Sequence, residues 1–198
     1  KPLSETVTTN NTVNSYFSRA SFANAQTSSL PLSLLNYESL RLPPSRITLL
    51  SDQSSWLNHY MPGLIMACWG RGHTLRWIHD AAKLATGDVC FLLSCGQLLN
   101  AKQLRLHRHN LVVHESALPE GQGWSPMTWQ ILEGAKCIPV TLFEAVAKLD
   151  AGPIYLQQQI QLQGHELVEE WRELQAQTTM KLCLRWLDRY NEVIDEAK

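Results

Sequence analysis

The sequence predicts an α/β fold in which a mostly parallel sheet is covered by helices on both faces. Apolar segments of strand length alternate along the chain with segments of helical spacing, the pattern of strand–helix–strand units. The run DVCFLLSCG (88–96) stays apolar until it stops at Ser and Gly, as in a central strand that is buried on both sides. The chain has 198 residues, of which 44% are hydrophobic, which is enough for one full-sized domain and too little for two large ones.

The first predicted strand, helix and second strand lie between residues 47 and 80. ITLLSD (47–52) is an apolar, β-rich run that ends on Asp and Ser. Apolar residues then recur at helical spacing through 56–69, where Pro62 is expected to kink or delay the helix. TLRWIHD (74–80) alternates in polarity and predicts a second strand.

The rest of the chain continues the alternation. In SPMTWQILEG, Ser125 is expected to cap a helix, Pro126 to occupy its first position and Gly134 to end it. The remaining predicted elements are a short helix (101–109), a strand (110–116), that helix (125–134), a strand (138–146), a strand with a glutamine face (152–163) and one long or two shorter helices (166–194).

Composition argues against several classes of partner. The formal net charge is -1 and the sequence pI is about 6.7, so no basic field suggests nucleic acid as a partner. The sequence contains no run of 18 apolar residues, so no membrane span is predicted. The cysteines are scattered, form no CxxC pair and predict reduced core residues of a cytoplasmic protein without a metal site: Cys68, Cys90, Cys95, Cys137 and Cys183.

The N-terminal segment differs in amino-acid composition from the rest of the chain. Residues 1–44 are rich in Ser, Thr and Asn and carry few charges. A segment of this kind buries little apolar surface, so it is expected to be a poorly ordered leader or linker. At the other end, residues 164–198 are expected to form a helical segment that packs on the α/β unit.

Polar residues follow several predicted strands, where ligands of parallel sheets collect. Ser94–Gly96, His114–Pro119 and the segment after Val146 are expected at this carboxyl edge. His114 stands where a strand meets a loop, either as a structural histidine bonded to a nearby carbonyl or as a functional group. Asp150, in the turn KLDAGPI, either forms that turn or lies beside His114, orienting the imidazole and raising its pKa.

Five of the six other histidines have contexts that favour the protein surface. They are His59, His73, His107, His109 and His165.

The pattern from His114 to Gln157 resembles the folate-dependent formyltransferases. In that family a strand ends in Asn-x-His-x-Ser-x-Leu-Pro, a Gly-containing loop and a Pro-led helix follow, and a Val-Thr strand leads to Asp-x-Gly. Here HESALP is followed by SP, ILEG, VT and LDAGPIY at family-like distances. The resemblance spans 46–163, so it implies a Rossmann-like catalytic domain over 45–163.

The resemblance implies that the domain binds 10-formyltetrahydrofolate and moves its formyl group to a primary amine. It assigns His114 and Asp150 as the catalytic residues. It places the pteridine of the folate against a hinge and a second loop, with Leu92, Leu93, Ser94, Cys95, Gly96, Leu149 and Gly152 as the binding residues. It places the amine substrate against the loop after the histidine, with Ser116, Leu118, Pro119, Gly123 and Trp124.

One departure concerns the catalytic asparagine, which in the family stands two residues before the histidine. Here Val112 has that place, and Asn110 lies two residues earlier on the same strand face. Two residues of strand span roughly 6–7 Å, so Asn110 replaces the asparagine only if the strand bulges. Otherwise an oxyanion donor is missing, which in acyl transfer costs about 3 kcal/mol, or another group supplies it.

Several acceptors and two non-catalytic roles stay open. GQGWSPMTWQ is similar to a Gly-Trp-x-Pro stretch of sugar N-formyltransferases, which favours an amino sugar, including a nucleotide-linked one. The alternatives are a methionyl-tRNA formyltransferase-like enzyme and a catalytically impaired binding protein. A further alternative is an assembly role or homodimer through the C-terminal helix, whose apolar residues include Trp171, Leu174, Leu182, Trp186 and Tyr190.

Overall fold

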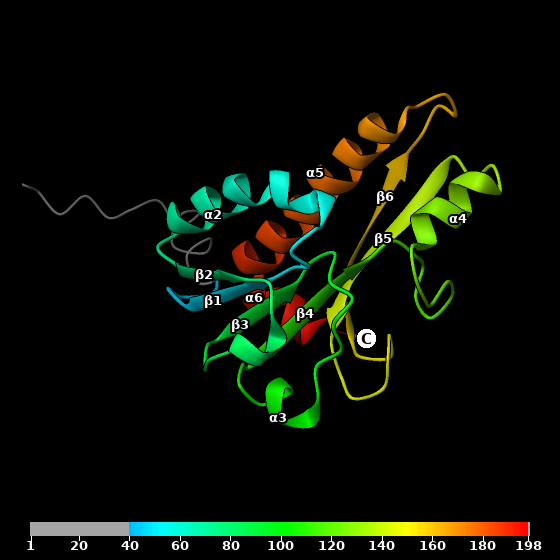
Figure 1. Cartoon of the computed structure of the whole chain (residues 1–198). Helices are drawn as coiled ribbons and strands as arrows, with labels where there is room; N and C mark the ends of the chain where they lie inside the picture. The colour runs from blue at the N-terminus through cyan, green and yellow to red at the C-terminus, as the bar shows by residue number, and fades with distance from the viewer. Residues whose placement is uncertain (1–39, 198) are drawn as a thin grey trace, which may run out of the picture.

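The computed structural model describes residues 40–197, which form a six-stranded sheet with helices on both faces (Figure 1). The strand order is β2-β1-β3-β4-β5-β6. Pairs β1–β2, β1–β3 and β3–β4 are parallel, whereas β4–β5 and β5–β6 are antiparallel. The strands are β1 (Arg46–Leu50), β2 (Thr74–Ile78), β3 (Val89–Leu92), β4 (His109–His114), β5 (Cys137–Glu144) and β6 (Ile154–Gln161). The predicted mostly parallel α/β sheet is thus confirmed.

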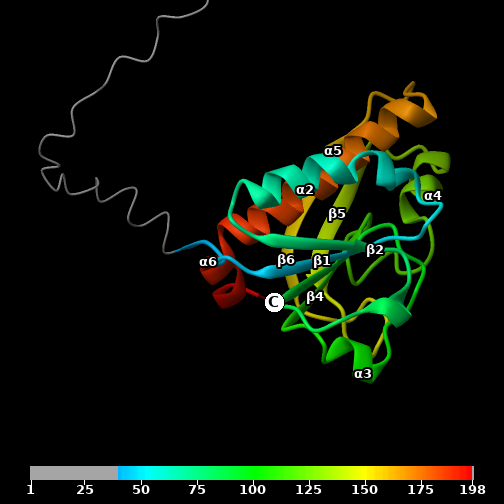
Figure 2. The ribbon, with the colours of Figure 1, turned by 60° about the vertical axis from the view of Figure 1, so that its left-hand side comes forward.

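The helices divide unequally between the two faces. The long helix α5 and the helix α2 lie on one face, and the short helix α3 lies on the other (Figures 1 and 2). The helical elements are η1 (Trp56–His59), α2 (Met61–Trp69), η2 (Ala81–Lys83), α3 (Ala101–Leu104), α4 (Pro126–Leu132), α5 (Val168–Asp188) and α6 (Tyr190–Asp195). The main core, including Phe91, Leu111 and Trp186, fills the α2/α5 side, and a small cluster around Leu50 and Leu92 covers the α3 side.

Local sequence explains where several helices begin. Pro62 lies in the first turn of α2, so the helical stretch is split into η1 and α2, as expected. The Ser55 hydroxyl accepts a hydrogen bond from Leu57 N at 3.2 Å and caps η1. Ser125 precedes α4 but its side chain makes no capping bond, because its backbone is left-handed with φ of 52°. The prediction of Ser125 as a side-chain cap is therefore wrong.

The direction of β5 corrects one expectation about the functional edge. His114 pairs with Thr141 and Leu111 with Glu144, so β5 ends beside the beginning of β4. The segment after Val146 therefore leaves the sheet at the amino end of β4, not at the carboxyl edge. It reaches the functional edge only by running back along the domain.

The C-terminal helices pack on their own domain. Leu182 and Trp186 of α5 and Tyr190 of α6 are buried, and Trp171 and Leu174 pack against the main core. These residues are therefore already in contact within the chain. The chain also enters the fold here, because Leu42 is buried and its N–H donates to Leu187 O at 2.8 Å. Residues 1–39 of the predicted leader lie outside the described residues.

Two histidines expected at the surface are instead buried. His73 is 4% exposed, and its Nδ1 accepts a hydrogen bond from Ser45 N at 3.2 Å. His107 is 5% exposed, with Nε2 3.0 Å from the hydroxyl of Thr48. The expectation failed because both lie next to polar residues in sequence, while the fold turns their rings inward.

Candidate active site

His114 ends β4 at the carboxyl edge of the sheet. By strand alternation it shares a face with Val112, whereas Leu111 and Val113 point into the main core under α5. Its Nε2 lies 3.0 Å from the carbonyl oxygen of Gly121. A carbonyl only accepts, so Nε2 carries the proton and Nδ1 is left as a free acceptor. That bond fits the structural reading of His114, and the free Nδ1 is what proton transfer requires.

The loop between β4 and α4 folds closely on itself. Gly121 has φ of 69°, and a Cβ built on it would lie 2.8 Å from the Cβ of Ser116, so only glycine fits there. Ser116 is buried, and its carbonyl accepts a hydrogen bond from the Thr141 hydroxyl at 2.6 Å. Leu118 is also buried, while Pro119 is exposed. Ser116 and Leu118 therefore shape the loop from inside.

Trp124 brings this loop to the hinge after β3. A Cβ built on Gly96 would lie 2.9 Å from two ring carbons of Trp124, so the indole rests directly on Gly96. Trp124 is otherwise 73% exposed. Gly123, just before it, has φ of 114° and open space beside it. Two segments that the resemblance assigns to different ligands are thus in contact.

Asp52 is a site residue that sequence reasoning did not single out. Its Oδ2 accepts a hydrogen bond from Gly96 N at 2.8 Å, and its Oδ1 accepts one from Gln97 Nε2 at 3.1 Å. Gln97 Nε2 also donates to His79 O at 3.0 Å, so the ends of β1, β2 and β3 are joined. The available signal was its position, directly after an apolar strand at the carboxyl edge.

The hinge keeps some of its backbone groups free. The Gly96 N–H is not among them, because it donates to Asp52 Oδ2. Within residues 40–197, the Cys95 N–H and C=O make no hydrogen bond, and Ser94 is left-handed with φ of 48°. Burial raises the pKa of the Cys95 thiol to about 11, with Asp52 adding to it, so the thiol is neutral at pH 7. Leu92 and Leu93, before the hinge, are buried.

The loop between β5 and β6 returns to the site through Asp150. Gln122 Nε2 donates to the Asp150 carbonyl at 3.1 Å, next to the Gly121 carbonyl that bonds His114. Asp150 is left-handed with φ of 49°. A Cβ on Gly152 would lie 1.8 Å from Glu144 O, so Gly152 lets the loop pass close to the end of β5.

The two residues assigned to catalysis are connected only indirectly. Both His114 and Asp150 are described, and no hydrogen bond or ion pair joins their side chains. The link runs through the Gly121–Gln122 segment. Leu149, beside Asp150, is exposed.

Asn110 is not brought to His114. It lies near the beginning of β4, where its Nδ2 donates to Leu104 O at 2.9 Å. No bulge shortens the path, because β4 pairs with β3 residue by residue from His109 to Val112. Four residues of strand separate Asn110 from His114, roughly 13 Å. The tentative assignment of Asn110 as a catalytic residue is therefore wrong in geometry.

Glu115 anchors the strand end to the helices. Its carboxylate accepts a hydrogen bond from Gln175 Nε2 of α5 at 2.6 Å, and its carbonyl accepts one from Gln130 Nε2 of α4 at 2.6 Å. Burial raises the pKa of this carboxyl group, opposed by the Gln175 hydrogen bond and by His114.

Other features of the described residues lie apart from this edge. A groove of about 760 Å³ between α2 and α5 is lined by residues that include Tyr60, Leu64 and Met180, none of which belongs to the candidate site. Among residues 40–197, no group of three or more His, Cys, Asp or Glu side chains is placed to hold a metal ion. In the same range, no helix combines the length and the apolar composition of a membrane span.

Comparisons with known proteins agree with this fold and edge. A family model described as formyl transferase matches residues 70–185. A methionyl-tRNA formyltransferase of Thermotoga neapolitana is 28% identical over 120 residues, which are 60% of this chain and 37% of the relative. The chain thus spans well under half of that relative's length.

Solved structures extend the likeness of fold. HypX from Aquifex aeolicus matches with a TM-score of 0.63 at 20% identity, over 75% of this chain and 27% of HypX. Another HypX structure is a complex with tetrahydrofolic acid and matches 60% of this chain and 22% of HypX, with a TM-score of 0.51 at 22% identity. A sugar N-formyltransferase from Shewanella sp. matches with a TM-score of 0.57 at 15% identity, over 77% of this chain and 71% of that enzyme.

The α/β sheet is therefore that of the formyltransferase fold. Because the family model covers more than half of its residues, this chain belongs to the formyl transferase family.

Proposed function

We propose that this chain is the catalytic domain of an N-formyltransferase that moves a formyl group from 10-formyltetrahydrofolate to a primary amine. The observation that carries the proposal is the meeting of three segments at one sheet edge: the hinge at Gly96, the loop after His114 and the loop containing Asp150. The free Nδ1 of His114 provides a proton acceptor there. The family membership and the HypX complex with tetrahydrofolic acid support the choice of donor.

The residues present fit a folate at this edge. The free N–H and C=O of Cys95 are a donor and an acceptor for the polar rim of a pterin. Exposed Leu149, on the loop that contains Asp150, offers apolar surface for the pterin ring. Bound there, 10-formyltetrahydrofolate would supply a formyl group attached to a nitrogen that can leave.

The side chains of the site would then accept and donate protons. As the amine nitrogen bonds to the formyl carbon and the bond to the folate nitrogen breaks, His114 Nδ1 takes the amine proton and returns a proton to the departing nitrogen. Gly121 keeps the imidazole oriented through Nε2. The carboxylate of Asp150, on the loop that Gln122 joins to this segment, stabilises the imidazolium by its negative charge.

An amino sugar, including a nucleotide-linked one, is the acceptor that we favour. Trp124 is exposed at the mouth of the site, where an aromatic ring can pack on a sugar or a base. The fold of a sugar N-formyltransferase matches more than two thirds of both chains.

Methionyl-tRNA is a second candidate acceptor, because curated relatives of this chain carry the name methionyl-tRNA formyltransferase. The net charge of -1 weighs against it, since tRNA binding draws on positive charge. A third candidate is a weakly active enzyme or a binding protein without activity. This candidate follows from Val112, which stands where the family has its catalytic asparagine.

A formylation assay tests the proposal. Purified protein is incubated with 10-formyltetrahydrofolate and a panel of free and nucleotide-linked amino sugars, and the formylated product is measured by mass spectrometry. His114→Ala is expected to lower kcat by about 10²–10⁴-fold, the usual contribution of a general acid–base group. His165→Ala, at an exposed histidine, is the matched control and is expected to keep full activity. Activity of His114→Ala within a few-fold of wild type would refute the assignment.

A further inference from the structure

Arg172 of α5 is a stacked cation without an anionic partner. Its guanidinium carbon lies 5.5 Å from the ring centroid of Trp56 and 5.6 Å from that of Trp171. Two indole faces of this kind hold a guanidinium plane in one orientation. Across residues 40–197, Arg172 makes no hydrogen bond and no ion pair, and its buried Nε is unpartnered.

Nearby carboxylates do not neutralise this cation. Glu169, one helical turn earlier, is exposed and forms no ion pair with it. Glu115 accepts instead from Gln175, one turn later than Arg172. Only the Nε of the Arg172 guanidinium is both buried and without a hydrogen-bond partner. The two terminal nitrogens therefore reach solvent, and their N–H groups are free. A partly buried cation in this state has unused capacity to bind an anion.

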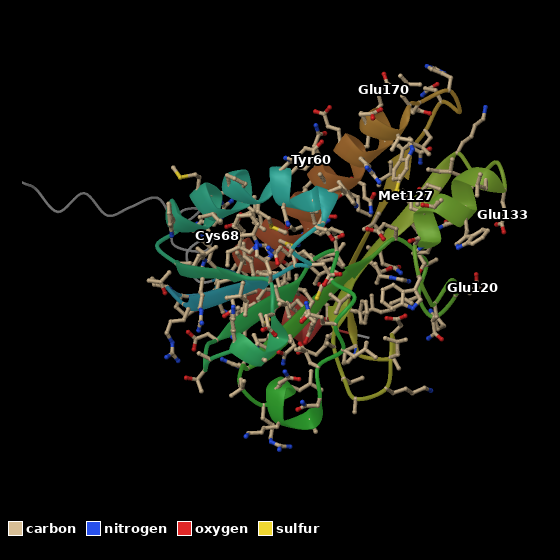
Figure 3. All side chains as sticks on the ribbon, in the orientation of Figure 1. Tyr60, Cys68, Glu120, Met127, Glu133 and Glu170 are labelled. Atoms are coloured by element: carbon tan, nitrogen blue, oxygen red, sulfur yellow. The ribbon has the colours of Figure 1, made fainter. Side chains whose placement is uncertain are left out.

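Arg172 stands over the same sheet edge as the candidate active site. Gln175, on the same side of α5, bonds to Glu115, the residue after His114. Trp56 follows the end of β1, four residues after Asp52, which holds the hinge. Figure 3 labels Glu170, two residues before Arg172, and Tyr60, just after η1, both in the layer above the sheet.

Arg172 lies on the opposite side of this edge from the proposed folate residues. His114 shares its face with Val112, which packs in the small cluster on the α3 side. The loop 145–153 also lies on the α3 side of the sheet in Figure 1, while η1 and α5 lie above it. The side with Arg172 is thus left for the second substrate.

We propose that Arg172, held between Trp56 and Trp171, binds a phosphate group of the amine acceptor. This inference rests on the proposed formyltransferase function, because it assigns the acceptor to the free side of the edge. A guanidinium edge with two terminal nitrogens matches two oxygens of a phosphate. The acceptor class is therefore a phosphorylated or nucleotide-linked amine, and Arg172 is a specificity residue for it.

Binding of inorganic pyrophosphate, measured by calorimetry in phosphate-free buffer, tests the site without requiring turnover. Wild type is expected to bind it saturably, and Arg172→Met to bind about tenfold or more weakly, since hydrogen bonds to charged groups are the strong ones. Arg172→Lys keeps the charge but loses the fork, so an intermediate affinity is expected. Arg185→Met, at an exposed arginine about 20 Å away along the same helix, is expected to bind like wild type. Thermal unfolding midpoints verify that each variant is folded, and Arg172→Lys remains informative if Arg172→Met is not.

Three results would overturn the inference. One is that wild type does not bind pyrophosphate, and another is that folded Arg172→Met or Arg172→Lys binds it as wild type does. The third is that N-(4-aminobenzoyl)-glutamate, which carries the carboxylates of the folate tail, displaces pyrophosphate from wild type, because Arg172 would then serve the donor. Failure of wild type to bind a folate analogue would instead refute the proposed function and leave the pyrophosphate result standing.

Discussion

Val112 is the residue at which this chain departs from the pattern of its family. It lies two residues before His114 on the same face of β4 and packs partly buried against the small cluster. An amide at that position would point toward the same side as the imidazole. A valine side chain has no hydrogen-bond donor, so residue 112 itself gives no hydrogen bond to a developing oxyanion.

Val112→Asn is expected to raise kcat by about tenfold or more, because one donor to a developing oxyanion is worth roughly 10²–10³ in rate and its geometry will be imperfect. Single-turnover formylation at saturating donor measures this. Val112→Thr, close in shape and shorter in reach, is the control and is expected to stay near wild type. A folded Val112→Asn protein that is no faster than wild type would show that another group already supplies the donor.

At the scale of elements, an ion pair fastens the end of α2 to the end of α5. Arg71 Nε and Nη2 donate to the two carboxylate oxygens of Asp188 at 2.8 and 2.7 Å, and Arg41 lies 3.4 Å from the same group. The Arg71 hydrogen bond is the main reason that the pKa of Asp188 is lowered below its usual 3.8. This contact holds the helical layer together on the side that carries the main core.

Asp188→Asn is expected to lower the free energy of unfolding by about 1–3 kcal/mol at pH 7. A carboxyl with a lowered folded pKa contributes stability above its unfolded pKa and loses it as pH falls through the folded value. The difference between wild type and variant should therefore shrink below about pH 4. Urea unfolding at pH 7 and pH 3 measures it, with Asp195→Asn, at an exposed carboxylate, as a control expected to be neutral. An equal loss at both pH values would contradict the ion-pair account.

The whole molecule is expected to lose stability in mild acid because of its buried histidines. Burial lowers the pKa of His73 and of His107 below 6.5. The unfolded chain then binds more protons than the folded one between those values and about 6.5, so stability falls as pH drops through that window. Glu115 acts in the opposite direction, because burial raises its pKa and its ionisation above 4.5 costs stability.

The substitution His107→Gln isolates the contribution of His107 to the pH dependence of stability. Its amide can replace the bond to the Thr48 hydroxyl without titrating. The free energy of unfolding of the variant is expected to change less between pH 7.5 and pH 5 than that of wild type, by at most about 1.4 kcal/mol per pH unit. Denaturant melts across that range measure the two slopes, and parallel slopes would contradict the assignment.

Much of the fold follows from local pattern, and the exceptions have physical causes. Continuous or alternating apolar runs located the strands, and Pro62 located the split between η1 and α2. The direction of β5 could not be read in this way, because an apolar strand pattern looks the same for either direction of pairing. The burial of His73 and His107 likewise depends on which surfaces the fold brings over them.

The sequence by itself determined the family of this protein, the positions of its sheet elements and the place of His114 at a strand end, because these depend on residues close together in the chain. Only the tertiary structure decided that Asp52 holds Gly96, that Trp124 rests on that glycine, and that Gln122 reaches Asp150. It also placed Arg172 between two indoles with no anion to match. Each of these contacts joins segments that are distant in sequence or depends on the orientation of one side chain. The periodicity of apolar residues carries no information about distant contacts or about side-chain orientation.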